Sequence, residues 1–239
     1  MNHFPTLLAS ELRQIDCPGN QGARLASEDD FGVLDLVNAE VVADAGGESV
    51  FMRQREDFFS LIIDAGGAIS LISEDDVPVG YSVAVPAGGG VPAFREAVES
   101  VGVVFGTAIR PGFRGRGWQR RMIKARRNAL LEHGCERLQA VCAPENHRSL
   151  SNLVSMGFQV VAHLGEVHGS PRFLTEFRPA GSSRLDQSSE VDAAVTLPPG
   201  GLLAEHESRL LSGKRGVRFV SGPEPALVYS QAELQLGVE

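Results

Sequence analysis

The basic residues of this chain are concentrated in one short segment that joins an apolar stretch to a helical pattern. From Arg110 to Arg127 there are eight basic residues and no acidic one, so the segment has a net charge of +8. The rest of the chain has 14 basic residues against 30 acidic ones. An acidic protein that gathers its cations in one segment is expected to have an anionic partner for it. The alternative is a solvated helix face, which is the more common role of a charge run.

The order of elements around this segment favours an anion site. Residues 101–109 are almost continuously apolar, as expected of a strand that is covered on both faces. A glycine-rich loop follows, and residues 118–133 have apolar side chains at helical spacing. A helix N-terminus leaves backbone N–H groups without partners, and glycines let a ligand approach them closely. The segment therefore predicts a phosphate or diphosphate site with Arg114 and Arg116 as further donors, and a tight turn on a basic surface is the alternative.

The remaining pattern predicts helices and strands in alternation, followed by a polar linker and a short tail. Helices are expected over residues 4–15, 27–45, 49–65 and 146–156, and strands over residues 23–26, 68–72, 77–85, 138–142, 158–162 and 173–177. The predicted organisation is an N-terminal helix in residues 1–20, a main domain in 21–179, a linker in 180–201 and an extension in 202–239. The extension is too small for a core of its own, so we expect it to dock on the main domain or on a partner.

Composition excludes several classes of protein. No apolar run approaches the ~18 residues of a membrane span, and the start of the chain lacks the basic and apolar regions of a secretory signal. Three cysteines without metal-ligand spacing indicate free thiols and a reduced, cytoplasmic setting. The net charge of −8 and the 6% aromatic content argue against a nucleic-acid-binding protein.

The loop and a second motif downstream resemble the GCN5-related N-acetyltransferase (GNAT) family. Arg114, Gly117 and Gln119 stand at positions of the family's Gln/Arg-x-x-Gly-x-Gly/Ala signature, with Gln119 in place of the final small residue. Residues 144–149, followed by Met156-Gly157-Phe158, resemble the family's Asn-x-x-Ala/Ser helix. The resemblance covers residues 21–178 and implies an α/β (α+β) fold. It has a mixed, mostly antiparallel central sheet with a splayed parallel strand pair, and helices on both faces.

In that family the signature binds the pyrophosphate of acetyl-CoA, and a neighbouring strand end holds the pantetheine arm. The resemblance implies that acetyl-CoA, the acyl donor, is bound by Thr107, Ala108, Ile109, Arg114, Gly115, Arg116, Gly117, Trp118, Gln119, Asn146 and Ser149. No metal is implied, and His163 and His168 lack a third ligand at suitable spacing.

The chain departs from the family at the catalytic acid. Many members have a tyrosine seven residues after the asparagine of the Asn-x-x-Ala/Ser motif. That asparagine is Asn146 here, and the residue seven positions later is Leu153. Tyr81, Glu99 and Ser149 are the candidates for proton transfer, and none is assigned.

The sequence thus predicts an acyl-CoA-dependent N-acyltransferase that transfers acetyl to a primary amine of a small molecule or peptide. A catalytically weak acetyl-CoA-binding regulatory module is the alternative, and nucleic-acid binding comes third. A homodimer contact through the extension is left open.

Overall fold

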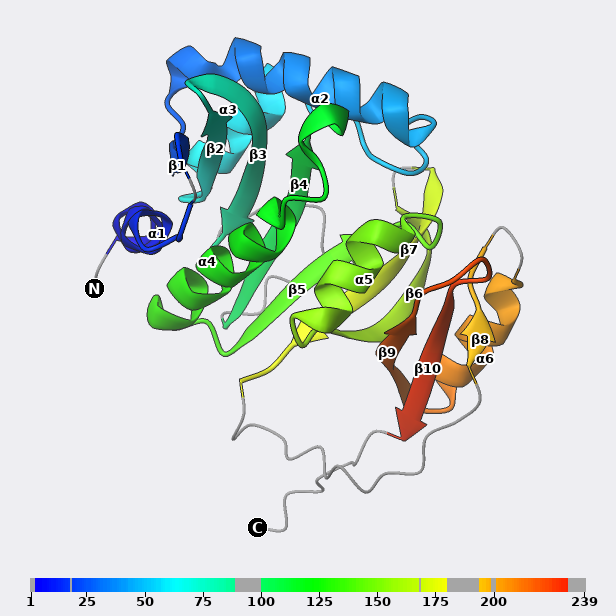
Figure 1. Ribbon diagram of the computed structural model, residues 1–239. Helices are drawn as coiled ribbons and strands as arrows, with labels where there is room; N and C mark the ends of the chain where they lie inside the picture. The colour runs from blue at the N-terminus through cyan, green and yellow to red at the C-terminus, as the bar shows by residue number, and fades with distance from the viewer. Residues whose placement is uncertain are drawn as a thin grey trace, which may run out of the picture. The chain divides into compact units, whose positions relative to one another are not determined.

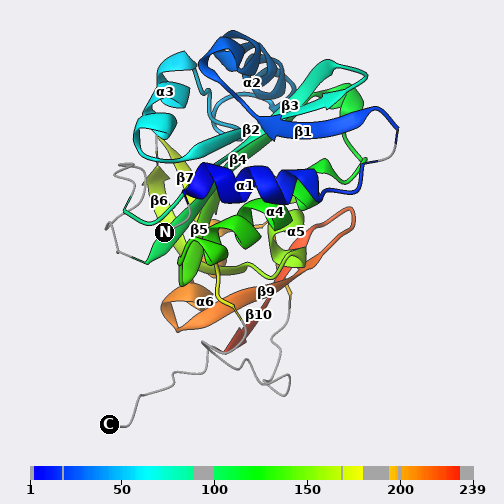
Figure 2. The same ribbon diagram turned by 90° about the vertical axis from the view of Figure 1, so that its left-hand side faces the viewer.

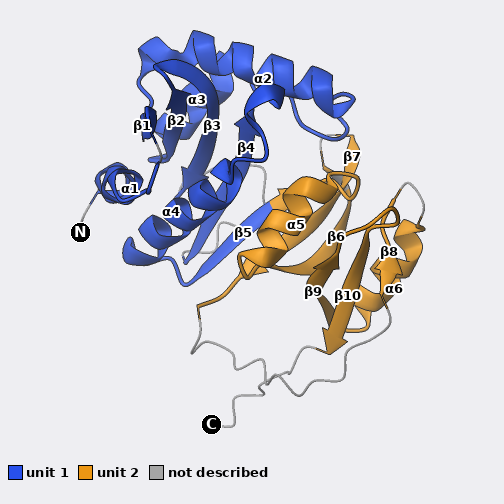
Figure 3. Ribbon diagram, in the orientation of Figure 1, with its two compact units in different colours: residues 1–140 blue, residues 141–239 orange. Residues whose placement is uncertain are grey.

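The structure is a computed structural model that describes residues 3–17, 19–88, 100–167, 169–179, 194–198 and 201–231. The chain divides into two compact units, unit 1 with residues 1–140 and unit 2 with residues 141–239 (Figure 3). Strand β5 (Arg137–Cys142) runs across this boundary.

Unit 1 is built on a sheet with the strand order β1-β2-β3-β4-β5 (Figure 1). Pairs from β1 to β4 are antiparallel, whereas β5 runs parallel to β4. The other strands are β1 (Gln21–Leu25), β2 (Ala68–Glu74), β3 (Val77–Val85) and β4 (Val101–Ile109). The helices are α1 (Phe4–Arg13), α2 (Phe31–Ala45), α3 (Glu56–Asp64) and α4 (Trp118–Glu132), with 3-10 turns η1 (Glu28–Asp30) and η2 (Pro111–Phe113).

Different helices cover the two faces of this sheet. On the face of α2 and α3, Tyr81, Val83 and Val85 of β3 join a cluster of buried apolar side chains. The residues between them point to the other face, because side chains alternate along a strand. That face carries α1 and α4, which contact each other (Figure 2). The predicted mixed, mostly antiparallel sheet with helices on both faces is confirmed.

The pairing of strand β4 with its two neighbours is irregular in two places. Its ladder to β5 covers only residues 101–103, opposite residues 137–139, although β4 continues to Ile109. This is the splayed parallel pair that the sequence predicts. On its other edge, β4 has one residue more than β3 between the pairs Ser82–Thr107 and Ala84–Val104. Such a β-bulge bends a strand and re-aims its backbone groups.

Unit 2 has the strand order β7-β6-β9-β10-β8. Its elements are α5 (His147–Ser155), β6 (Gln159–Val167), β7 (Ser170–Phe177), β8 (Val195–Thr196), α6 (Leu203–Leu211), β9 (Lys214–Val220) and β10 (Ala226–Gln231). Strand β9 of the extension pairs with β6, and α5 and α6 both pack on β9. The extension therefore adds strands to the sheet of β6.

Two segments differ from the pattern-based expectation. The helix predicted over residues 49–65 begins only at Glu56, because the Asn38 side chain binds the backbone before it. Its Oδ1 accepts from the Gln54 N–H at 2.8 Å and its Nδ2 donates to the Met52 carbonyl at 3.3 Å. The predicted linker contains β8, where Val195 is buried and pairs with Leu227 of β10. A strand of two residues is too short to give a compositional signal.

A buried histidine joins the pieces of the extension. His206 of α6 is fully buried, with Nδ1 2.8 Å from the Tyr229 hydroxyl and Nε2 2.9 Å from the Thr196 carbonyl. A neutral ring satisfies both contacts, since Nε2–H donates to the carbonyl and Nδ1 accepts from the hydroxyl. Burial lowers the pKa of His206 below its ordinary value.

This burial predicts that the protein loses stability as the pH falls through and below about 6.5, the pKa of an unperturbed histidine. The unfolded chain then binds a proton at His206 that the folded chain does not, so the proton favours unfolding. Thermal melting between pH 7.5 and pH 5.5 measures the effect. His206→Gln, which does not titrate, is the control and is expected to flatten the profile. An equally steep profile in both proteins would contradict this role of His206.

Candidate functional site

The turn between β4 and α4 has a backbone that glycine makes possible. Gly115 has φ +80°, and Gly117, the N-cap of α4, has φ +79°. These values lie in the left-handed region that disfavours residues with a Cβ atom. A Cβ added at Gly112, Gly115 or Gly117 would meet no heavy atom of the described residues within 4 Å, so these residues leave open space beside this stretch of backbone.

The backbone N–H groups of this turn are open to a ligand. Gly115, Arg116 and Gly117 are exposed, and their N–H groups donate no hydrogen bond within the residues that the structure describes. Gly117 has no side chain that could cap α4, and the helix dipole adds partial positive charge at the same place. Successive N–H groups in such turns form anion-binding concavities. The geometry therefore fits a phosphate or diphosphate.

The arginines of this segment form ion pairs with acidic side chains that the sequence did not predict as their partners. Arg110 pairs with Glu40 at 3.1 Å and Arg114 pairs with Asp44. Glu40 and Asp44 lie one helical turn apart on α2, a spacing that puts both carboxylates on one face of the helix. This spacing was the available sequence signal, but only the fold brings α2 beside the turn.

Glu74, at the end of β2, binds a side chain of the turn and the first side chain of α4. It is 5% exposed, and its carboxylate accepts from Trp118 Nε1 at 2.7 Å and from Arg116 Nη1. Trp118 itself is buried and lies under the guanidinium of Arg121. The indole is therefore an anchor for the start of α4. What Trp118 can offer a ligand is its backbone rather than its ring.

The end of β4 presents its backbone in two directions. The Arg110 N–H donates to the Val79 carbonyl of β3 at 2.9 Å. Because successive residues of a strand alternate, Ala108 also points its backbone groups toward β3, whereas Thr107 and Ile109 point theirs to the opposite edge. The Ile109 carbonyl on that edge accepts from Arg114 Nε at 3.0 Å. Of the three strand residues predicted to bind the donor, Thr107 and Ile109 thus have suitably directed backbone groups.

Tyr81, a predicted catalytic candidate, lies in the core. Its side chain is fully buried and packs edge-on against Phe59 at 5.3 Å between ring centroids. The hydroxyl donates to Gln54 Oε1 and accepts from Asn38 Nδ2, both at 2.7 Å. Burial raises the pKa of Tyr81 further above its ordinary value. These contacts argue against Tyr81 as an acid for a bound ligand, because its proton is held inside the core.

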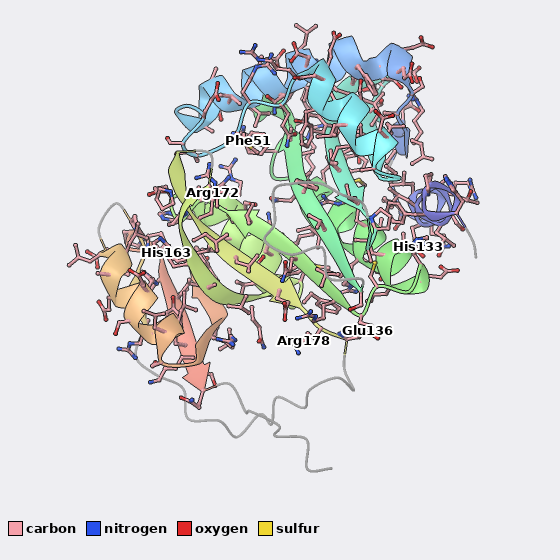
Figure 4. All side chains as sticks on the ribbon, turned by 180° about the vertical axis from the view of Figure 1, so that it is seen from behind. Phe51, His133, Glu136, His163, Arg172 and Arg178 are labelled. Carbon is pink, nitrogen blue, oxygen red and sulfur yellow. The ribbon has the colours of Figure 1, made fainter. Side chains whose placement is uncertain are left out.

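The segment between α2 and α3 lies against the bulge of β4. A Cβ added to Gly106 would lie 3.4 Å from the ring of Phe51 and 3.9 Å from Gln54 Nε2 (Figure 4 labels Phe51). Gln54 is itself buried, and its Oε1 accepts a hydrogen bond from the Tyr81 hydroxyl. The network of Asn38, Tyr81 and Gln54 therefore fixes the segment that lies beside the bulge.

In unit 2, the predicted residues lie at the start of α5. Asn146 is the N-cap, and its Oδ1 accepts from the Ser149 N–H at 3.1 Å. Leu153 is buried. Burial raises the pKa of the nearby Cys142 thiol to about 12, which keeps this cysteine protonated and unreactive at neutral pH. Glu99 lies outside the described residues.

Neither a metal-binding group nor a membrane-spanning helix is found in the described part of the chain. There, no three His, Cys, Asp or Glu side chains form a group that could hold a metal ion. None of the helices described has the length and apolar character needed to cross a membrane.

Comparison with known proteins identifies the family of this chain and agrees with its mixed sheet. The model of the acetyltransferase (GNAT) family matches residues 36–158, slightly more than half of the chain. This chain therefore belongs to the acetyltransferase (GNAT) family. A comparison with curated proteins gives no match.

Solved structures share the fold at low sequence identity. yncA of Salmonella typhimurium, solved with its cofactor acetyl-CoA, is 15% identical with a TM-score of 0.54, covering 67% of this chain and 94% of that one. The aminoglycoside acetyltransferase AAC(6')-Ib, in complex with coenzyme A and kanamycin, is 15% identical with a TM-score of 0.53, covering 66% and 94%. A GNAT-family protein from Desulfovibrio desulfuricans is 15% identical with a TM-score of 0.51, covering 66% and 98%.

The left-handed backbone of Gly117 predicts a cost for any side chain there. Gly117→Ala is expected to lower the free energy of unfolding by about 1–2 kcal/mol, because an L-residue disfavours this conformation. Gly112→Ala is the matched control, since its φ lies outside the left-handed region and its added Cβ has open space. It is expected to be neutral or stabilising by up to about 1 kcal/mol. Urea unfolding followed by the fluorescence of Trp118, the single tryptophan, measures both, and equal effects would contradict the assignment.

Proposed function

We propose that this protein is an acyl-CoA-dependent N-acyltransferase that transfers acetyl from acetyl-CoA to a primary amine. The observation that carries the proposal is the exposed turn of Gly115, Arg116 and Gly117, whose N–H groups have no partner in the described residues. Family membership gives this anion site its ligand, since the family is one of acetyltransferases.

Two parts of the proposed donor, the diphosphate and the pantetheine arm, have matching parts in unit 1. The N–H groups of the turn would hold the diphosphate, with the helix dipole of α4 behind them. Thr107 and Ile109 point backbone groups to the edge of β4 that leaves β5, and an amide-rich arm can add to such an edge as a strand would. Acetyl-CoA supplies the thioester from which the acyl group leaves. The roles of Gln119, Asn146 and Ser149 toward the donor stay predictions of the family resemblance.

The ion pairs of the turn shape how the donor would be recognised. Arg114 and Arg116 already have carboxylate partners in Asp44 and Glu74, so their charge is partly compensated before a ligand arrives. We infer that these arginines mainly hold the turn in shape and that the backbone supplies most of the diphosphate contacts. Donors fixed in advance lose little entropy when the ligand binds.

The acceptor is proposed as a cationic amine. The net charge of −8 attracts cations over the protein surface as a whole. AAC(6')-Ib, which shares the fold, is an aminoglycoside acetyltransferase. An amine attacks the thioester only when neutral, so a base or a water chain has to remove its proton. Ser149 and Glu99 stay the candidates for proton transfer.

A second function is favoured by two observations about tyrosine. Leu153 stands at the family position of the catalytic tyrosine, and Tyr81 is locked in the core. A regulatory module that binds acetyl-CoA without turnover would show these features. A panel of amines with detection of free CoA thiol separates the two functions, because any amine that raises thiol release above the rate in water excludes the module.

Nucleic-acid binding is disfavoured further by the acidic partners of Arg110, Arg114 and Arg116.

A carboxylate placed in the turn is expected to abolish donor binding. Gly117→Glu should weaken acetyl-CoA binding by at least about tenfold in calorimetry, because the new charge repels the diphosphate at close range. Gly134→Glu is the matched control, since Gly134 also has a positive φ (+106°) and open space for a Cβ. It lies beyond the far end of α4, about 20 Å along a helix of 15 residues, where salt screens its charge.

The two variants carry the same added charge and a comparable backbone strain. A difference in their affinity for acetyl-CoA therefore reports the effect of where the charge is placed. The control is expected to bind acetyl-CoA within about twofold of the wild-type protein. Equal affinity of Gly117→Glu and wild type would overturn the proposal, and so would a wild-type protein that does not bind acetyl-CoA.

A further inference from the structure

Arg126 of α4 is a cation in the core of unit 1. It is 1% exposed and donates all of its hydrogen bonds to neutral oxygen atoms. Nε binds the Met122 carbonyl at 3.0 Å, and Nη1 binds the carbonyls of Val83 at 2.8 Å and Phe105 at 2.6 Å. Nη2 binds Thr107 Oγ1 at 2.7 Å. No carboxylate of the described residues pairs with it.

Such a group is costly to bury, so its presence requires a structural reason. A charged side chain without an ionic partner loses its hydration and regains only hydrogen bonds to dipoles. Burial lowers the pKa of Arg126 to about 9, which still leaves the guanidinium charged at neutral pH. A leucine or methionine here would fill the space without that cost. The hydrogen bonds must therefore serve something that an apolar side chain cannot.

The contacts of Arg126 coincide with the bulge of β4. Val83 is the β3 residue opposite the bulge, and Phe105 is one of the two β4 residues that face it. A bulge disrupts the ladder locally, which leaves backbone groups without their regular cross-strand partners. One Nη1 group binds a carbonyl from each strand, so the guanidinium bridges the two strands where their register shifts.

The third contact reaches the residue where the register resumes. Thr107 pairs with Ser82 after the bulge, and its hydroxyl is bound by Arg126 Nη2. Ser82 on β3 and Ser70 on β2 lie in register with Thr107, so three hydroxyl side chains form a row beneath α4. Both serine hydroxyls are buried without a partner in the described residues. Thr107 is the member of this row that Arg126 contacts.

We propose that Arg126 is a positioning residue, which holds the bulge of β4 so that Thr107 and Ile109 present their backbone groups to the pantetheine arm of the donor. The inference rests on the proposed function. Arg126 acts through the strand and touches no part of the ligand. Without it, the bulge relaxes and the edge of β4 loses its fixed direction, while the turn at Gly115–Gly117, held by Glu74 and Asp44, stays in place.

Two ligands separate the strand from the turn. Acetyl-CoA and 3′-phospho-ADP share the diphosphate and the adenosine 3′-phosphate, but only acetyl-CoA has the pantetheine arm. Arg126→Met is expected to weaken acetyl-CoA binding in calorimetry by at least about tenfold and to leave the affinity for 3′-phospho-ADP within about twofold of wild type. Arg126→Lys keeps the charge and some of the hydrogen-bond donors. Its affinity for acetyl-CoA is therefore expected to lie between those of Arg126→Met and the wild-type protein. Lys124→Gln removes an exposed charge from the same helix and is expected to change neither affinity.

A second readout needs no ligand. Amide hydrogen exchange over residues 104–109 is expected to quicken in Arg126→Met and to stay unchanged in Lys124→Gln, because only the first loosens the bulge. If Arg126→Met does not fold, as judged by Trp118 fluorescence, Arg126→Lys gives the same test with a smaller loss for acetyl-CoA alone.

The outcomes separate this inference from the proposed function. An equal loss of both ligands, or no loss of either, in the folded variants overturns the role of Arg126 and leaves the proposed function standing. A wild-type protein that binds neither ligand overturns the proposed function and, with it, this inference.

Discussion

The candidate site depends on a turn whose backbone is held from behind while its N–H groups face solvent. Glu74 binds both the Trp118 indole and Arg116, so a single buried carboxylate connects the start of α4 to the end of β2. Asp44, on α2, pairs with Arg114. Glycines at 115 and 117 then adopt left-handed conformations at an exposed place, where no side chain from the described part of the chain occupies the space beside them. A rigid turn with open donors binds an anion without first paying for its own ordering.

The same arrangement changes the meaning of the basic segment. In the sequence, its net charge of +8 indicates either a site for an anionic partner or a solvated helix face. In the structure, three of its arginines have carboxylate partners, Arg121 lies over Trp118, and Arg126 is inside the core. Much of the charge therefore organises the protein's own backbone. This use of arginine is consistent with its planar fork of donors, which can bind several oxygens at once.

The elements around the site could be predicted because their signals are local. The apolar strand, the glycine turn and the amphipathic helix each fit within a few residues of sequence, and the structure places β4, η2 and α4 accordingly. The partners of the turn could not be predicted, since Glu74 and Asp44 are 42 and 70 residues from the arginines they bind. Arg126 looked like one more member of a charged helix face, because no pattern in the sequence marks the bulge that it fills. Tyr81 was a reasonable candidate by residue type, and its burial with Asn38 and Gln54 is a tertiary fact.

The most direct test of the account is the response of individual backbone amides to acetyl-CoA. In a ¹⁵N-labelled sample titrated with acetyl-CoA, the account predicts that the largest chemical-shift changes fall on the amides of Gly115, Arg116 and Gly117 and on those of Thr107 and Ile109. Saturable binding that leaves these amides unmoved, with the changes gathered elsewhere in the chain, would contradict it.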